Sequence, residues 1–370
     1  MIKTILDYGA TLYKNNKEAL DGQVSSHQAI QDMLDDTGHA VLPPYGSLYH
    51  GDSVFGWHDR SSITSLGQSN KGLSIVTDKP ISMFIPVQKR NVIKGFTAYY
   101  VGDKITEECA VVRLGGDERN IGGIYYKSNG TPFHRYPNRT SAIGHDFDFD
   151  MQGDENYYIS ATTNRAIKNP NFIENGNAHG VWVDYDNETE DKYSCLHWIK
   201  IRGDWNCINT GLKITKRKGS SQSMNNLDLK VDINAARMYA DIHGTLNRST
   251  IIINGQEKPT LGFNENAIWS ESKREYIDPN RYDNEEWQVP MFYIEGSAMN
   301  CGIFAYDRHS KSKKGRGRHK IKGQYHVKGL NLTFPLLVDE NNIRVDADFN
   351  DSTFRQDSVI KSIAGIRINE

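Results

Sequence analysis

A short strand motif recurs along this chain, and it restricts the possible folds more than any other feature. Each copy has a glycine, an apolar residue and then an alternation of residue types; the copies are Gly95–Tyr99, Gly123–Tyr126, Gly211–Ile214, Gly329–Leu332 and Gly365–Ile368. Related strands without the glycine are 110–114, 227–233 and 251–253. The gaps between copies vary, which a solenoid tolerates because each coil can carry a loop of any length. The pattern predicts an all-β fold, either a solenoid of β-coils or a sandwich.

One helix is predicted near the N-terminus, over residues 26–35. Ser25 and Ser26 are N-cap candidates, apolar residues then recur at helical spacing, and Gly38 ends the segment. The residues that follow, 39–46, are expected to form a short strand that enters a turn.

The first fifty residues resemble the opening of right-handed parallel β-helix proteins of the pectin-lyase-like superfamily, in particular bacteriophage tailspikes. The resemblance rests on Asp7-Tyr8-Gly9-Ala10, on Ala29-Ile30-Gln31 and on Val41-Leu42-Pro43-Pro44-Tyr45-Gly46. In that family a "DYGA" strand precedes a short helix that caps the coil stack, and an "LPPG" strand begins the first coil. The family commonly has two aspartates and a threonine before "AIQ"; here Ser25-Ser26-His27 stand there, and Ser26 can still cap the helix.

The resemblance implies an organisation and a function. Residues 1–50 would hold the N-terminal strand, the capping helix and the first coil, and residues 51–370 the β-helix body. Such spikes are homotrimers of the virion tail that fold in the host cytoplasm, contact other tail proteins and bind bacterial surface polysaccharides, which many of them cleave. Their catalytic carboxylates vary in position, so the resemblance assigns no catalytic residue here.

Composition excludes several other classes of protein. The chain carries 44 basic and 46 acidic side chains, so its net charge of −2 gives no global attraction to nucleic acid or membrane. No stretch approaches the roughly 18 apolar residues of a membrane span, and the N-terminus lacks the apolar core of a signal peptide. The four cysteines form no CxxC pair, which predicts reduced, mostly buried thiols and no structural metal site. No HExxH, Walker loop, GxSxG or Gly-rich dinucleotide-binding turn is present, and no cofactor is predicted.

The first candidate site is the segment His145–Asp150. Its alternation predicts a strand with Asp146, Asp148 and Asp150 on one face and two phenylalanines on the other. Same-face neighbours lie about 6.7 Å apart, close to the roughly 6.5–9.5 Å between the carboxylates of inverting glycosidases. Clustered carboxylates also raise one another's pKa, as a general acid requires. The alternatives are a calcium site and a solvated strand face.

A second candidate combines carboxylates with tryptophans. Asp184 and Asp186 project together beside Trp182, and Trp198 and Trp205 are close in sequence. The pairs Asp146/Asp148 and Asp184/Asp186 are the catalytic candidates, and the three tryptophans are candidate ligand-binding residues. Sugar rings stack on aromatic faces while carboxylates accept hydrogen bonds from hydroxyls, so these residues suit a saccharide surface. The alternative is that the tryptophans are simply packed.

The strand 227–233 offers a third arrangement. Its leucine, valine and isoleucine side chains are expected to point inward and Asp228, Lys230 and Asp232 outward, with Asp241 and His243 on a neighbouring coil. Stacked coils are about 4.8 Å apart, near the roughly 5 Å that separates a retaining carboxylate pair. The alternative is a purely structural strand.

Two segments of the predicted body are expected to leave the coils. Residues 262–296 are rich in aromatic residues and predict an insertion that contacts either ligand or the next subunit. Residues 308–320 hold seven Lys or Arg and no acid, so the rest of the chain carries −9; the candidate ligand-binding residues are Lys311, Lys313, Lys314, Arg316 and Arg318. Such a segment attracts phosphate or uronate polymers or is a mobile solvated loop. Nucleic acid is disfavoured, because interleaved aromatic residues are absent.

The sequence therefore leads to a tailspike or tail-fibre subunit that recognises a bacterial surface glycan. Depolymerase activity, as a hydrolase or a lyase, is an open question. The alternatives are a non-catalytic adhesin or structural part of the tail, and a bacterial polysaccharide lyase or hydrolase.

Overall fold

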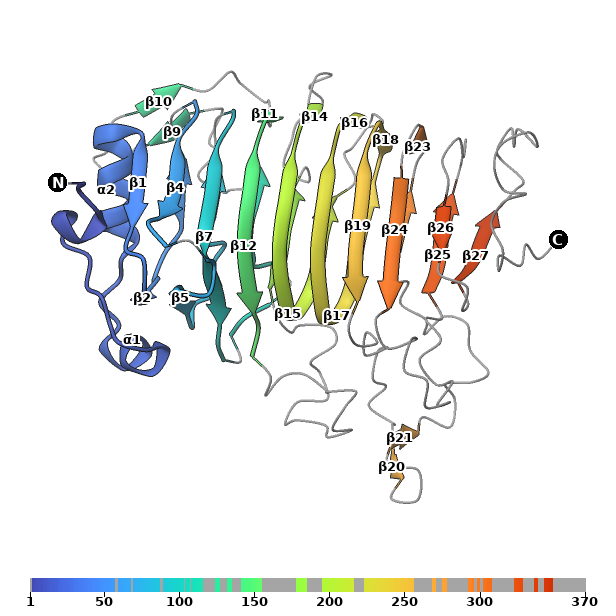
Figure 1. Cartoon of the computed structure of the whole chain (residues 1–370), viewed down its shortest axis with the longest axis horizontal. Coiled ribbons are helices and arrows are strands. Elements are labelled where there is room, and N and C mark those ends of the chain that lie inside the picture. The colour runs from blue at the N-terminus through green and yellow to red at the C-terminus, as the bar shows by residue number, and fades with distance from the viewer. Residues whose placement is uncertain are drawn as a thin grey trace.

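The chain is mostly β-structure in parallel sheets, with few helices (Figure 1). The structure is a computed structural model that describes residues 2–56, 59–67, 69–86, 89–102, 104–106, 108–115, 124–126, 132–134, 141–154, 178–184, 195–215, 223–255, 268–270, 275–277, 292–295, 298–299, 302–307, 323–328, 336–338 and 343–348. Helices α1 (Asn16–Gly22) and α2 (His27–Thr37) lie at one end of the long axis, and β27 (Ile343–Asp348) lies toward the other.

The chain comes back to the same parallel ladder repeatedly, and each such passage, here called a return, adds one strand to it. We call this ladder the first ladder. Its members are β1 (His39–Leu42), β4 (Ser62–Ser65), the start of β7 (Val92–Tyr100), β12 (Asp146–Gln152), the starts of β15 (Lys200–Ile214) and β17 (Asp228–His243), β19 (Thr250–Gly255), β24 (Gly302–Asp307) and β26 (Leu336–Val338). The aligned residues of one row are His39, Ser62, Val92, Asp146, Lys200, Asp228, Thr250 and Gly302. These aligned residues are unevenly spaced in the sequence, which corresponds to the uneven gaps between the sequence repeats.

Two further parallel ladders run beside the first. The second ladder contains β3 (Val54–Gly56), β6 (Phe84–Pro86), β8 (Ala110–Gly115), β13 (His179–Asp184), the ends of β15 and β17, β22 (Phe292–Glu295), β25 (Gly323–Lys328) and β27. The third ladder contains β11 (Ser141–Ile143), β14 (Cys195–His197), β16 (Ser223–Asn225), β18 (Thr245–Asn247) and β23 (Ala298–Met299). Between the first two ladders, β2 (Gly46–Tyr49) pairs with β5 (Leu73–Thr77), which pairs with the end of β7.

Two hairpins stand apart from these ladders. Strands β9 (Ile124–Tyr126) and β10 (Pro132–His134) pair antiparallel, so the predicted repeat at Gly123–Tyr126 is not a member of the stack. Strands β20 (Ile268–Ser270) and β21 (Glu275–Ile277) form the second antiparallel pair, inside the predicted insertion. Strand β22 lies in the second ladder, so Phe292 and Tyr293 belong to the stack and not to the insertion.

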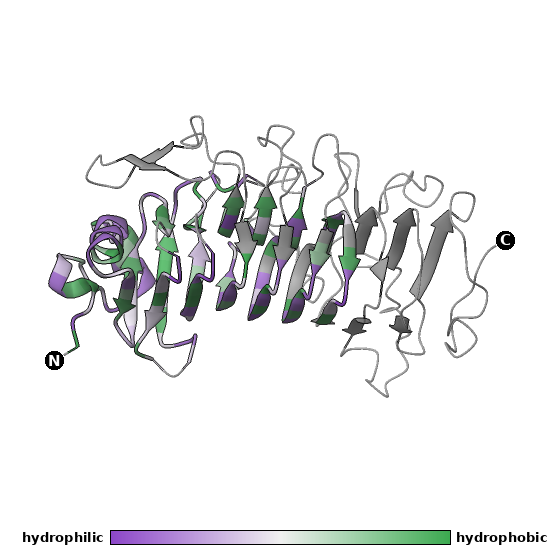
Figure 2. Cartoon of the chain, turned by 90° about the horizontal axis from the view of Figure 1, so that it is seen from above, coloured by the Kyte–Doolittle hydropathy of each residue, from purple (hydrophilic) through white to green (hydrophobic). Residues whose placement is uncertain are grey.

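The core lies between the ladders and runs along the stack. Apolar side chains of successive strands fill it, and Figure 2 shows hydrophobic segments alternating with hydrophilic ones along the strands. Aromatic rings succeed one another through it: Phe84 packs on Phe96 at 5.4 Å between ring centroids, Phe96 on Phe149 at 5.9 Å, and Phe149 on Trp205 at 5.6 Å. Because each ring comes from a different return of the chain, this column ties the successive returns together.

The predicted capping helix is confirmed as α2 (His27–Thr37), and Gly38 ends it at φ 77°. Its buried residues Ala29, Ile30, Met33 and Leu34 join the core of the stack. Ser26 occupies the N-cap position, but its side chain does not cap the helix. Its hydroxyl donates instead to the carbonyl of Tyr49 at 2.9 Å, because the end of β2 lies against the start of the helix.

The predicted N-terminal strand at Asp7–Ala10 is wrong. Ile5–Tyr8 forms a 3₁₀ helix, η1, because Thr4 and Asp7 cap it reciprocally and Gly9 ends it at φ 89°. Sequence analysis also missed the helix α1 (Asn16–Gly22), whose N-cap Asn15 accepts from the backbone N–H of Glu18 at 3.0 Å. The spacing of Asn15 and Glu18 was the available signal.

None of the helices in the described part of the chain combines the length and apolar character needed to cross a bilayer. Of the four cysteines, Cys109 is described with a free, buried thiol, as predicted, and burial raises the pKa of that thiol.

Candidate functional site

The outward face of β12 is the centre of the candidate site. The strand alternates between half-buried and buried residues, so Asp146, Asp148 and Asp150 face outward while Phe147 and Phe149 are fully buried. This division of the two faces is as the sequence predicted. The neighbouring strands β7 and β15 run parallel on either side of β12 and determine which side chains meet these carboxylates.

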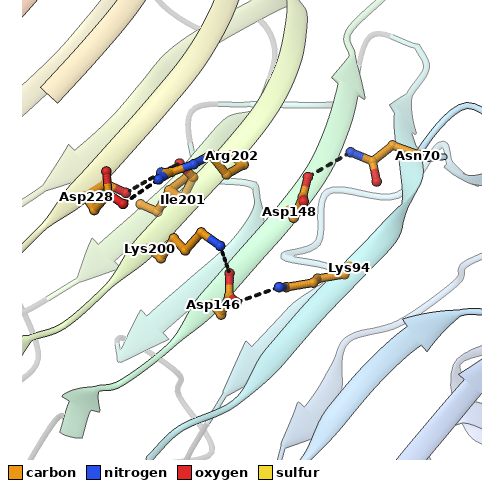
Figure 3. Close-up of polar contacts among 8 residues, drawn as sticks. All are labelled: Asn70, Lys94, Asp146, Asp148, Lys200, Ile201, Arg202 and Asp228. Carbon is orange, nitrogen blue, oxygen red and sulfur yellow. Dashed lines mark hydrogen bonds and ion pairs between the residues drawn. The ribbon is translucent and has the colours of Figure 1, made fainter. Parts of the chain in front are cut away.

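Asp146 lies between two lysines of the flanking strands (Figure 3). Lys94 Nζ on β7 is 2.5 Å from Asp146 Oδ2, and Lys200 Nζ on β15 is 3.8 Å from Asp146 Oδ1. Lys200 is aligned with Asp146 across the ladder, whereas Lys94 is aligned with Asp148 and reaches Asp146 diagonally. The first carboxylate of the predicted catalytic pair is therefore held in a three-residue charge cluster.

Asp148 and Asp150 share an amide. Asn70 Nδ2 donates to Asp148 Oδ1 at 3.0 Å and to Asp150 Oδ1 at 3.2 Å. The two carboxylate oxygens can therefore be no more than about 6 Å apart, the two bonds laid end to end. Asp150 Oδ1 also accepts from the backbone N–H of Asp204 at 3.0 Å. These contacts arise where the register between β7 and β12 shifts, between Asp148 and Asp150.

A further charge pair continues the row toward β17. Arg202 on β15 lies next to Asp148 in the ladder, and its guanidinium forms an ion pair with the carboxylate of Asp228 on β17 (Figure 3). The same guanidinium donates to the carbonyl of Asp228 at 2.8 Å. The outward face of β7, β12, β15 and β17 thus carries acids and cations side by side, and Asn70 adds an amide from the turn between β4 and β5.

The calcium alternative finds no support. Among the described residues, no group of three or more His, Cys, Asp or Glu is arranged to hold a metal ion. The acids of β12 are engaged instead with lysines, an amide and a backbone N–H.

Trp205 is not a ligand-stacking residue in this structure. It is 0% exposed, it stacks on Phe149, and its indole N–H donates to the carbonyl of Phe149 at 2.9 Å. Gly203 makes room for this bond, since a Cβ there would lie 2.0 Å from that carbonyl oxygen and 2.5 Å from the indole nitrogen. Trp205 points inward on β15 and therefore belongs to the column of aromatic rings in the core.

Trp182 lies on β13 and is only 3% exposed. Arg113 from β8 and Lys213 from β15 approach its ring from the strands on both sides, at 4.0 and 4.5 Å from the ring centroid. Its ring therefore engages two cations and offers no open face for a sugar. Asp184 ends the same strand and pairs with Gly115, whereas Asp186 lies outside the described residues.

Trp198 is the exposed member of the three tryptophans. It is 63% exposed and adopts a positive φ of 54° in the turn between β14 and β15.

The basic segment 308–320, with Lys311, Lys313, Lys314, Arg316 and Arg318, lies outside the described residues, and its role in ligand binding stays a prediction.

The strand 227–233 has the predicted faces. Leu227, Leu229, Val231 and Ile233 are buried, while Lys230 is exposed. Asp241 and His243 do not lie on a neighbouring coil, because β17 continues unbroken from Asp228 to His243. Their side chains pair with each other, with His243 Nε2 3.2 Å from Asp241 Oδ1.

Sequence reasoning missed the partners of the carboxylates, namely Asn70, Lys94, Lys200 and Arg202. They lie far from β12 in sequence; the register of the parallel strands brings Lys94, Lys200 and Arg202 beside it, and Asn70 reaches it from the turn before β5. Alternation within each strand could have placed Lys94, Lys200 and Arg202 on an outward face. The alignment of one strand with the next has no such local signal.

Comparison with protein-family models, with characterised proteins and with solved structures finds no match to this chain.

Proposed function

We propose that this chain is a right-handed parallel β-helix that serves as a subunit of a phage tailspike or tail fibre and recognises a bacterial surface polysaccharide. The parallel ladders and the helix α2, which covers the apolar end of the stack, support the architecture. The N-terminal residues that resemble tailspikes support the family. Homotrimerisation, attachment to other tail proteins and a place in the virion tail form part of this proposal.

The observation that carries the proposal is the outward face of β7, β12, β15 and β17. It aligns half-exposed carboxylates and basic side chains across four neighbouring strands, and the amide of Asn70 joins them from the turn before β5 (Figure 3). Carboxylates and amides exchange hydrogen bonds with sugar hydroxyls, and a flat row of such groups suits an extended polymer rather than a small enclosed ligand.

The same geometry bears on cleavage. The Asp148 and Asp150 oxygens lie no more than about 6 Å apart, a range that includes the separation of about 5–5.5 Å used by retaining glycosidases, yet the Asn70 amide donates to both of them. Asp146 is engaged by Lys94 and Lys200. These contacts favour binding, with the depolymerase and the bacterial lyase or hydrolase as the alternatives.

The test combines binding, chain length and mass. The purified protein is incubated with surface polysaccharides from candidate hosts, and retention, polymer size and new reducing ends are followed. We expect a trimer that binds one of these polymers. The double variant Asp148→Asn and Asp150→Asn should weaken this binding about tenfold or more, since two carboxylate acceptors are lost.

The matched control is Asp32→Asn, an exposed carboxylate on α2 away from the ladder face, which should bind like the parent. Shortened polymer chains would identify a depolymerase and turn Asp148 and Asp150 into catalytic candidates. A monomer that binds no polysaccharide would overturn the proposal.

A further inference from the structure

A column of left-handed residues runs along one corner of the stack, between the third ladder and the first. From β4 to β19, each return of the chain places one residue there at positive φ: Arg60 (64°), Arg90 (59°), Gly144 (74°), Trp198 (54°), Asn226 (56°) and Arg248 (50°). Backbone hydrogen bonds link each corner to the next: Arg60 N to Lys89 O, Arg90 N to Ile143 O, Gly144 N to His197 O, Trp198 N to Asn225 O, and Asn226 N to Asn247 O, all 2.8–3.0 Å. We call these six residues the corner column.

Most of the corner column consists of residue types that disfavour this conformation. Glycine adopts positive φ freely and asparagine tolerates it, whereas arginine and tryptophan are sterically disfavoured there. Arg60, Arg90, Trp198 and Arg248 are all exposed, so burial does not compensate the strain. The backbone bonds between strands set positive φ at these positions, where glycine or asparagine would cost least, so arginine and tryptophan there point to a role for the side chains themselves.

The arginines of the corner column are available to a ligand. Within the described part of the chain, no carboxylate forms an ion pair with Arg60, Arg90 or Arg248. The two acids in the adjoining row of the first ladder, Asp146 and Asp228, are already paired with lysine and arginine side chains. The corner therefore has positive charge that nothing in the described structure neutralises.

The spacing of the corner column suits a polymer that runs along the stack. Neighbouring strands of a ladder are about 4.8 Å apart. Trp198 is two strands beyond Arg90 and two strands before Arg248, which places it about 10 Å from each along the axis. Gly144 and Asn226 stand between them, and the side chain of Arg90 reaches over Gly144, where an added Cβ would lie 3.0 Å from Arg90 Cγ.

We propose that the corner column binds an acidic polysaccharide, with the guanidinium groups pairing with carboxylates of the polymer and Trp198 stacking on a sugar ring. Arginine binds carboxylates in a bidentate manner, and an exposed indole supplies the apolar face that sugars require. This inference rests on the proposed function and names the class of its polymer. Nucleic acid is disfavoured, because single-stranded chains are bound by successive aromatic residues and this column has one.

The conformation of the corner column allows a variant that keeps the fold. The triple variant Arg60→Gly, Arg90→Gly and Arg248→Gly places glycine at three positions of positive φ, so its thermal midpoint should equal or exceed that of the parent. Its affinity for alginate, a polyuronate, should fall about tenfold or more in low salt. Trp198→Gly should weaken the same binding about threefold or more.

A second triple variant distinguishes the effect of the corner column on binding from the effect of overall charge. Lys3→Ala, Lys17→Ala and Lys71→Ala remove the same charge from exposed sites elsewhere and should leave alginate binding within about twofold. The triple variant with lysine at the three arginine positions restores the charge and should recover part of the affinity.

Alginate, neutral dextran and single-stranded poly-dT are compared with each variant. Loss of alginate binding in the glycine variant alone supports the inference. Equal binding by parent and glycine variant, no alginate binding by the parent, dextran bound as tightly as alginate, or tighter binding of poly-dT would each overturn it. Host-polysaccharide binding through Asp148 and Asp150 would survive any of these results, so the proposed function can stand when this inference fails.

Discussion

The inner and outer faces of β12 and β15 are built from one alternating sequence but use different interactions. Inward, Phe149 and Trp205 stack in the aromatic column and exclude water. Outward, Asp146 and Lys200 form a half-exposed ion pair. Burial of a large aromatic side chain contributes several kcal/mol, whereas an exposed ion pair contributes about 1 kcal/mol or less. The inner face therefore fixes the fold, and the outer face can change its side chains without unfolding the stack.

The largest expected effect contrasts two tryptophans. Trp205→Ala should lower the free energy of unfolding by about 3–5 kcal/mol, because it removes a fully buried ring and the hydrogen bond to Phe149. Trp198→Ala should change it by about 0.5 kcal/mol or less, because that ring is exposed. Urea denaturation of both variants measures the difference. Equal losses would show that the corner, like the core, holds the stack together.

A buried polar residue gives the next largest effect. His50 lies at the cap end of the core, in contact with Phe84 and near His27 and Asp52. Burial lowers the pKa of His50 to about 4; His27 lowers it further, while the hydrogen bond to the Met83 carbonyl and the charge of Asp52 oppose the shift.

The folded chain therefore resists protonation of His50, whereas the unfolded chain takes up the proton below about pH 6.5. Stability due to His50 is present above pH 6.5 and is lost as the pH falls toward 4, on the order of 3 kcal/mol in all. His50→Gln, which can still donate to the Met83 carbonyl, should flatten the pH dependence of the urea midpoint over this range. His39→Gln, at an exposed histidine, is the control; if it flattens the curve as much, buried His50 is not the cause.

The difference between the faces also explains what the sequence could predict. Alternation at Phe147 and Phe149, and helical spacing at Ile30 and Leu34, are local signals of burial, and they predicted the strand faces and the capping helix correctly. The prediction for Trp205 was wrong because tryptophan suits both a core and a sugar-binding surface. Only its place in the inward and outward alternation of β15 shows that it is buried.

The partners of the carboxylates had no local signal. Asn70 and Asp148 are 78 residues apart in sequence, and their contact depends on how many residues each return of the chain contains. The uneven gaps of the repeat hide that register. The corner column was equally hidden, since positive φ at arginine contradicts residue preference and follows from the backbone bonds between strands.

The smallest expected effect comes from the two lysines that pair with Asp146. Comparing them tests whether the outer face contributes to stability at all. Lys94→Ala should lower the free energy of unfolding by about 0.5–1 kcal/mol, and Lys200→Ala by about 0.5 kcal/mol or less. Lys94 is closer, at 2.5 Å against 3.8 Å, and its side chain is less exposed, at 31% against 46%. Urea midpoints in low salt and in about 1 M salt measure both, since salt screens exposed pairs and should remove most of the difference. A loss at Lys94 as large as that at Trp205, or one that salt leaves unchanged, would mean that this ion pair supports the fold and is not a replaceable part of a binding surface.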